Sequence, residues 1–173
     1  LDLLTPKLFL PVGCILCAIV GMACGSSWTT TATIGLAFLG IGAGLGIPAP
    51  ITAGMIISGA YVGDKFSPLS DTTNLAAAVA ETGLFDHVTA MVSTTGPTLL
   101  IALILYTILG LNVDTSAYDA TVAEGIQEAF RGAFTISPIL LLPIIVVIVM
   151  CILRVPGLVG IAVSVATAVV FML

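Results

Sequence analysis

Polar side chains are concentrated in one short stretch of this chain, residues 64–74, which lies between long apolar segments. The stretch combines carboxylates, an ammonium, an amide and hydroxyls, contributed by Asp64, Lys65, Ser67, Ser70, Asp71, Thr72, Thr73 and Asn74. A single charge at the centre of a bilayer costs at least about 2.5 to 3.5 kcal/mol on insertion scales. Charges at that depth need partners, water or a ligand, so these residue types indicate an ion-binding site.

Pro68 supplies a backbone reason for a site in this stretch. Proline has no N–H to donate to the carbonyl four residues earlier, which is that of Asp64, and it disfavours helical geometry in the residue before it. We therefore expect a helix break over residues 64–71, centred on Pro68, with the Asp64 carbonyl freed. Ser70 and Asp71 are good N-cap types, so a new helix is expected to start there. Broken helices of this kind hold ions near the midplane of transporters.

The expected ligands are hard oxygen atoms, which suit a small cation such as sodium better than a transition metal. We hypothesise that sodium binds at Asp64 and Asp71, with Lys65 as their charge partner. Protons and sodium compete for carboxylate oxygens, and that competition is the minimal chemistry of an antiporter. The alternative interpretation of the stretch is an aqueous turn between two helices, with its charges solvated.

Two further polar clusters interrupt apolar segments. One is a facing hydroxyl cluster that follows Gly25 and comprises Ser26, Ser27, Thr29 and Thr30. Its hydroxyls can surround an ion without carrying charge, although hydroxyls that bond back to the carbonyls of an ordinary helix are a competing interpretation. The other cluster, residues 93–98, contains Pro97, and a simple proline kink is the favoured interpretation there.

The composition as a whole is that of a membrane protein. The 173 residues are 59% hydrophobic and 8% charged, whereas soluble domains carry roughly 25% charged residues. The net charge of -5 comes without any basic patch, which excludes nucleic-acid binding. The four cysteines lie in apolar segments, without the polar surroundings that a zinc site needs.

The hydropathy pattern predicts an all-α fold, a polytopic transmembrane bundle with Pro-interrupted helices in a single transporter domain. A crossing needs about 20 mostly apolar residues. The expected segments are residues 8–25, 30–46, 51–63 with a break at 64–71 and a continuation over 72–80, 87–111, 137–153 and 158–173. An extramembrane loop with a short amphipathic helix is expected over residues 112–131. Glycines 40, 42, 44 and 46 form two GxxxG motifs, which predict close helix packing.

Two segments carry a resemblance to a known family. Residues 25–35 are GSSWTTTATIG and residues 59–74 are GAYVGDKFSPLSDTTN, and together they resemble the NhaC family of sodium/proton antiporters. The resemblance is specific over residues 25–80, and elsewhere it lies mainly in hydropathy. It implies a secondary transporter built from inverted repeats with broken helices. Carried over residue by residue, it implicates Asp64, Ser67, Ser70, Asp71, Thr72 and Asn74, with Ser26, Ser27, Thr29 and Thr30 as the facing element.

The activity that the resemblance implies is exchange of sodium for protons, with no cofactor besides the transported sodium ion and proton. The family also includes exchangers of malate and lactate, so a small carboxylate is the alternative substrate. The expected partners are the lipid bilayer of a prokaryotic plasma membrane, the remainder of a longer transporter of which this chain is a fragment, and a second copy in a homodimer. A passive channel or structural subunit is a further alternative. An intramembrane aspartyl protease is disfavoured, because Asp64 and Asp71 lie on one segment.

Overall fold

The computed structural model describes residues 6–113, 132 and 137–172. Within these ranges every regular element is a helix and none is a strand, which confirms the all-α prediction. The loop and amphipathic helix expected over residues 112–131 lie, except for the first two residues, outside the described part of the chain.

The chain forms a series of helices separated by short connections. In order they are α1 (Phe9–Cys24), α2 (Ser27–Thr30), a π-helical turn η1 (Thr31–Gly35), α3 (Leu36–Gly44), α4 (Ala49–Phe66), α5 (Asp71–Val79), α6 (Leu84–Leu111), a 3-10 turn η3 (Pro138–Leu141), α8 (Leu142–Ile152) and α9 (Gly157–Met172). The elements α2, η1 and α3 follow one another without a gap, so they form one helical run over residues 27–44, which overlaps the segment expected over residues 30–46 and begins and ends earlier.

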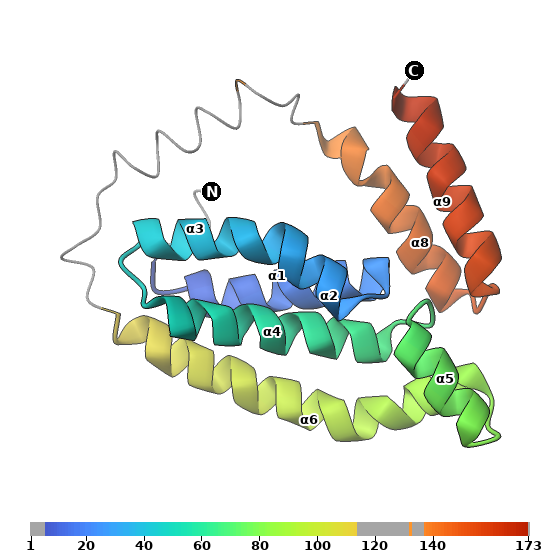
Figure 1. Ribbon diagram of the computed structural model, residues 1–173, viewed down its shortest axis with the longest axis horizontal. Coiled ribbons are helices and arrows are strands. Elements are labelled where there is room, and N and C mark those ends of the chain that lie inside the picture. The colour runs from blue at the N-terminus through green and yellow to red at the C-terminus, as the bar shows by residue number, and fades with distance from the viewer. Residues whose placement is uncertain (1–5, 114–131, 133–136, 173) are drawn as a thin grey trace.

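Two further helices extend beyond the membrane segments expected from the sequence. α4 has 18 residues, Ala49–Phe66, where the segment was expected over residues 51–63. α6 begins at Leu84, where the segment was expected over residues 87–111. α6 contains Pro97 without interruption, and Figure 1 shows this helix changing direction part-way along its length. That shape is the one expected for a proline kink.

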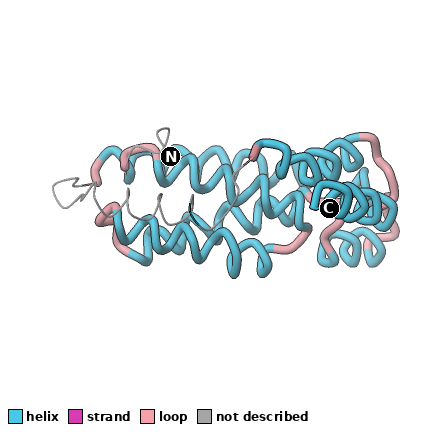
Figure 2. Tube along the Cα trace, turned by 90° about the horizontal axis from the view of Figure 1, so that it is seen from above, coloured by secondary structure: helices cyan, strands magenta, loops and turns pink. Residues whose placement is uncertain are grey.

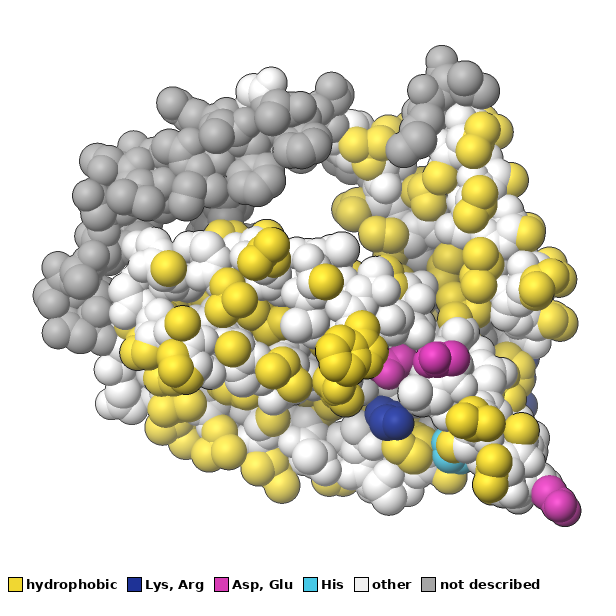
Figure 3. All heavy atoms as spheres, viewed as in Figure 1, with side chains coloured by type: hydrophobic (Ala, Val, Ile, Leu, Met, Phe, Trp, Pro, Cys, Tyr) yellow, Lys and Arg dark blue, Asp and Glu magenta, His cyan; other side chains and the backbone are white. Residues whose placement is uncertain are grey.

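The long helices lie side by side, and a separate hairpin stands at one end of them. α1, α3, α4 and α6 run along the long axis of the molecule, whereas α8 and α9 pack against each other at one end, where α8 contacts α1 (Figures 1 and 2). In the described ranges, α6 is the one helix of at least 18 residues that is apolar enough to cross a membrane, and shorter apolar helices cover Phe9–Cys24, Ile139–Ile152 and Gly157–Val170. Apolar side chains cover much of the visible surface (Figure 3), as expected for a chain that faces lipid and further protein.

The core lies between α1, α3 and α4. Phe9 in α1 meets Phe38 in α3 edge to face, with ring centroids 5.8 Å apart. Around this pair the buried apolar side chains are Leu10, Cys14, Cys17, Leu45, Ile47, Met55 and Ile56. Cys14 and Cys17 therefore act as small packing residues here.

The closest contact between helices is that of α1 with α4. A Cβ atom on Gly59 would fall on the Cys14 carbonyl oxygen, and one on Gly63 would fall on the Ala18 carbonyl oxygen. Gly21 makes the reciprocal contact from α1, since a Cβ there would lie 2.8 Å from the Ala60 carbonyl oxygen. Absence of side chains at these positions lets the two backbones touch.

The GxxxG motifs predicted at positions 40 to 46 are not the ones that bring helices closest. A Cβ on Gly42 would lie 2.6 Å from the Thr52 Oγ1 atom, so this glycine does pack tightly. A Cβ on Gly40 would meet no atom of the described residues within 4 Å. The decisive motif is the GxxxG of Gly59 and Gly63, which the sequence analysis did not single out.

We predict that Gly63→Leu destabilises the full-length parent protein, because a side chain at this position forces α1 and α4 apart. Overpacking costs about 1 to 3 kcal/mol, and more where backbone must move. The measurement is the melting temperature of the purified protein in detergent. Gly40→Leu is the matched control and is expected to leave the melting temperature nearly unchanged. Equal effects of the two substitutions would contradict this account of the packing.

Candidate functional site

The first helix break follows α1. Gly25 adopts a left-handed conformation (φ 65°) and ends α1 with a hydrogen bond from its N–H to the Gly21 carbonyl at 2.9 Å. Ser26 is extended, and its hydroxyl caps α2 by accepting the Thr29 N–H at 3.2 Å. The hydroxyl cluster therefore starts a new helix, as a capping serine does.

Within the new helix, several hydroxyls bond back to carbonyls four residues earlier. The donors are Thr30, Thr31 and Thr33, at distances of 2.7 to 2.9 Å. After the break these threonines are back-bonded to the helix, as the competing interpretation expected, and the ion-binding interpretation of the cluster stays a prediction.

The second break follows α4 and is shorter than predicted. It covers residues 67–70, whereas the prediction covered residues 64–71. The Ser67 N–H bonds to the Asp64 carbonyl at 3.1 Å, and this bond closes the last turn of α4 in place of the missing Pro68 donor. Ser67 itself is extended (φ -85°, ψ 123°), as the residue before a proline should be.

The prediction that the Asp64 carbonyl is free was wrong. Besides the Ser67 N–H, this carbonyl accepts the Thr73 hydroxyl at 3.3 Å. Thr73 is buried, and it was not among the predicted site residues. The spacing in the sequence could have identified Thr73 as a buried residue. It lies three residues after Ser70 and four before the buried Ala77, on the inward face of α5.

The remaining polar groups of the second break hold its own backbone. Ser70 caps α5 by accepting the Thr73 N–H at 3.4 Å, and its hydroxyl also shares a hydrogen bond with Thr72 Oγ1 at 3.0 Å. The Asn74 amide donates to the carbonyls of Pro68 and Ser70, at 2.9 and 2.7 Å. The carbonyls of Asp64, Pro68 and Ser70 are thus satisfied by protein groups.

The two breaks meet each other. A Cβ on Gly25 would lie 2.8 Å from the Leu69 carbonyl carbon, so the first break packs directly on the second. Ser67, which is completely buried, donates its hydroxyl to the Met22 carbonyl at 2.7 Å. These contacts place the first residues of α2 beside the end of α4.

At this junction lies a buried carboxylate, and only one of its two oxygen atoms has a hydrogen-bond partner among the described residues. Asp64 is 4% exposed, and its Oδ2 atom accepts the Ser27 hydroxyl at 3.2 Å. Its Oδ1 atom is buried and has no hydrogen-bond partner among the described residues. A buried carboxylate oxygen without a partner is costly and demands an explanation. A proton or a small cation on Oδ1 would supply the missing interaction.

The second acid of the stretch lies in a different environment. Asp71 is exposed in the first turn of α5, and its Oδ1 atom accepts the Thr72 N–H at 2.8 Å. On the visible surface, most charged side chains gather near the junction of α4 and α5 (Figure 3). The two carboxylates therefore differ in burial, and Asp64 is the one enclosed by protein.

Lys65 does not act as the hydrogen-bonding partner of Asp64. The Ser27 hydroxyl occupies Oδ2, and Oδ1 has no partner in the described part of the chain. Consecutive residues on a helix do not face each other, so the half-buried Lys65 side chain leaves α4 in another direction.

The facing hydroxyl cluster contributes one group to the carboxylate. Ser27 reaches Asp64, whereas Ser26 and Thr29 bond to each other at 3.1 Å. Thr30 is fully buried and donates to the Ser26 carbonyl. No group of three or more His, Cys, Asp or Glu side chains that could hold a metal occurs within the described ranges. One carboxylate with neighbouring hydroxyls is a donor set suited to a monovalent hard cation.

Comparisons with known proteins agree with this chemistry. The model of the Na+/H+ antiporter family matches residues 59–173. The arginine/ornithine antiporter ArcD of Halobacterium salinarum is 45% identical over 170 residues, which are 97% of this chain and 35% of that protein. The malate-2H(+)/Na(+)-lactate antiporter of Bacillus subtilis is 39% identical over 157 residues, 91% of this chain and 34% of that protein.

A third relative is the Na(+)/H(+) antiporter NhaC of Alkalihalophilus pseudofirmus, 37% identical over 170 residues, which are 98% of this chain and 36% of that protein. This chain thus spans about a third of the length of the curated relatives it matches. No solved structure matches it significantly. The resemblance carried by the two polar motifs is confirmed, and it indicates a membrane transporter rather than a catalytic enzyme. The chain belongs to the Na+/H+ antiporter family.

Proposed function

We propose that the full-length parent protein exchanges sodium for protons across the membrane, and that Asp64 is the group on which the two ions compete. The observation that carries the proposal is the unpartnered, buried Oδ1 atom of this carboxylate. A buried carboxylate is stabilised either when it binds a proton or when it binds a cation. The Oδ1 atom of Asp64 cannot bind both at once. Exclusive occupancy couples the movement of one ion to the return of the other.

Ser27 takes a supporting role in this proposal. Its hydroxyl donates to Asp64 Oδ2, and a hydroxyl oxygen keeps lone pairs that can face a cation. Ser67, Ser70, Thr73 and Asn74 keep the helix break in place through the backbone bonds described above. Lys65, Asp71 and Thr72 belong to the proposal as polar groups at the rim of the site.

A second candidate is exchange of small organic carboxylates with sodium and protons. Lys65 at the end of α4 favours it, because a carboxylate substrate needs a cationic partner. The malate and lactate exchanger among the relatives fits the same candidate. In either case we propose a prokaryotic plasma membrane as the location, the remainder of the transporter as the partner that completes the protein, and a homodimer as its assembly.

Asp64→Asn is predicted to abolish sodium-dependent proton flux, because an amide neither binds a proton at ordinary pH nor offers sodium a charge. The measurement uses vesicles that contain the full-length parent protein and a pH-sensitive dye. Asp71→Asn is the matched control, and we expect it to retain much of the flux because Asp71 lies at the rim. If the flux survives in Asp64→Asn and disappears in Asp71→Asn, the ion-binding site must be assigned to Asp71 instead.

Ser27→Ala is predicted to raise the sodium concentration for half-maximal exchange by about tenfold, since a hydrogen bond to a charged group is worth about 1.5 to 3 kcal/mol. The same vesicle assay, run over a series of sodium concentrations, gives this value. Thr29→Ala removes a neighbouring hydroxyl that bonds only to Ser26, so it should leave the value near that of the wild type. An unchanged sodium dependence in Ser27→Ala would remove Ser27 from the site.

A further inference from the structure

The buried positions of the helical run after Gly25 change their spacing at the π-helical turn. In the second half the buried residues are Gly35, Phe38, Gly42 and Leu45, which follow one another by steps of three or four. In the first half they are Ser27 and Thr30. The step from Thr30 to Gly35 is five residues, and it coincides with η1. The turn therefore contains one residue more than an α-helical turn would.

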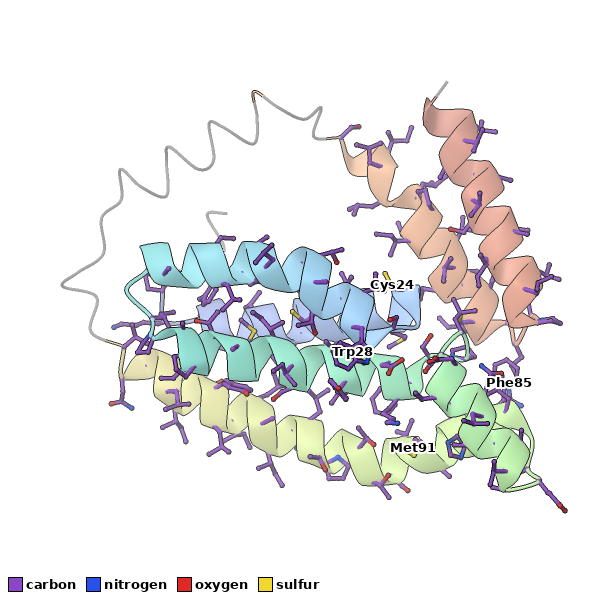
Figure 4. All side chains as sticks on the ribbon, in the orientation of Figure 1. Cys24, Trp28, Phe85 and Met91 are labelled. Carbon is purple, nitrogen blue, oxygen red and sulfur yellow. The ribbon has the colours of Figure 1, made fainter. Side chains whose placement is uncertain are left out.

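This extra residue decides which side chain faces Asp64. Steps of four and three, counted back from Gly35, lead to Thr31 and Trp28 rather than to Thr30 and Ser27. In the structure Ser27 is buried on Asp64, while the next residue, Trp28, is 80% exposed. Figure 4 labels Trp28, whose side chain is seen in front of α4 in this view. A regular α-helix would have presented the indole to the site.

The two sides of the turn are held differently. On the α3 side, a Cβ on Gly35 would lie 2.6 Å from Ile56 Cγ2, and Gly42 packs on Thr52, so α3 is fixed to α4. On the α2 side the chain leads back to the left-handed Gly25, a residue that changes conformation at low cost. A one-residue shift at the turn would thus rotate α2 while α3 stays in place.

We propose that η1 is the positioning element of the site, and that its conversion from π to α geometry replaces Ser27 by Trp28 at Asp64. The proposal rests on the proposed function, because it assigns the two registers to two states of the exchange cycle. Bound sodium favours the π register, in which Ser27 faces the carboxylate. Without sodium, the α register is favoured, and the indole covers the site.

The energetics of this shift are balanced enough for a ligand to select the state. A π-turn is rare because α geometry is normally preferred, and burial of an indole adds to that preference. Against this, the π register supplies Asp64 with the Ser27 hydroxyl. Sodium shifts the equilibrium only if it binds one register better, and the Ser27 oxygen provides that difference.

The first test removes the extra residue. Deletion of Ala32 in the full-length parent protein leaves a four-residue step from Thr30 to Gly35, so an α-helix now keeps Ser27 on Asp64 and Trp28 outside. We expect binding of radioactive sodium to be retained and sodium/proton exchange in vesicles to be lost. Ala37→Ser changes an exposed position of α3 past the turn and should exchange like the wild type. Exchange at the wild-type rate after the deletion would overturn the proposal.

A second measurement decides the question even if the deletion variant does not fold. In a cysteine-free background of the full-length protein, Trp28→Cys is labelled with N-ethylmaleimide in sodium and in choline. Labelling is expected to slow severalfold when sodium is removed. Leu36→Cys lies past the turn at a position that is 67% exposed and should react equally in both salts. Equal labelling rates at position 28 in both salts would overturn the proposed shift of register at η1. Absence of sodium binding to the wild type would instead overturn the proposed function.

Discussion

The whole site depends on the direct contact of two helix backbones. At Gly59 and Gly63 no side chain separates α4 from α1, so carbonyl groups of α1 lie against α4. This contact sets the relative height of the two helices, and it brings the break after α1 against the break after α4. Because α2 starts two residues beyond Gly25, its first turn then lies beside Asp64. A side chain larger than hydrogen at either glycine would separate the groups that meet at the carboxylate.

The hydrogen bonds of the α4 break explain why Asp64 differs from the other polar residues of the stretch. A broken helix leaves backbone groups without their usual partners, and here Ser67, Thr73 and Asn74 satisfy groups of the α4 break. Most of the polar residues in the stretch therefore stabilise the break itself. Once these bonds are assigned, the Oδ1 atom of Asp64 is left over. In the proposed site, one carboxylate oxygen is therefore the expected ligand, and most of the other polar residues of the stretch hold the backbone around it.

Local features of the site could be predicted from the sequence, whereas tertiary ones could not. The interruption at Pro68, the helix start at Ser70 and the break after Gly25 follow from backbone rules that act over a few residues. The extent of the break did not follow, because the Ser67 N–H replaces the lost proline donor. The different burial of Asp64 and Asp71 depends on which face of each helix packs inward, and no local rule sets that. Likewise, several glycine pairs had the GxxxG spacing, and only the fold selects the pair that touches a neighbour.

In the proposed mechanism the transported cation binds at Asp64, where the two breaks meet. Crystals of the full-length protein, soaked in thallium as a heavy monovalent cation, would locate the ion directly through its anomalous scattering. We expect a peak next to Oδ1 of Asp64, within reach of the Ser27 hydroxyl. A peak beside Asp71 at the exposed start of α5, with none at Asp64, would contradict it.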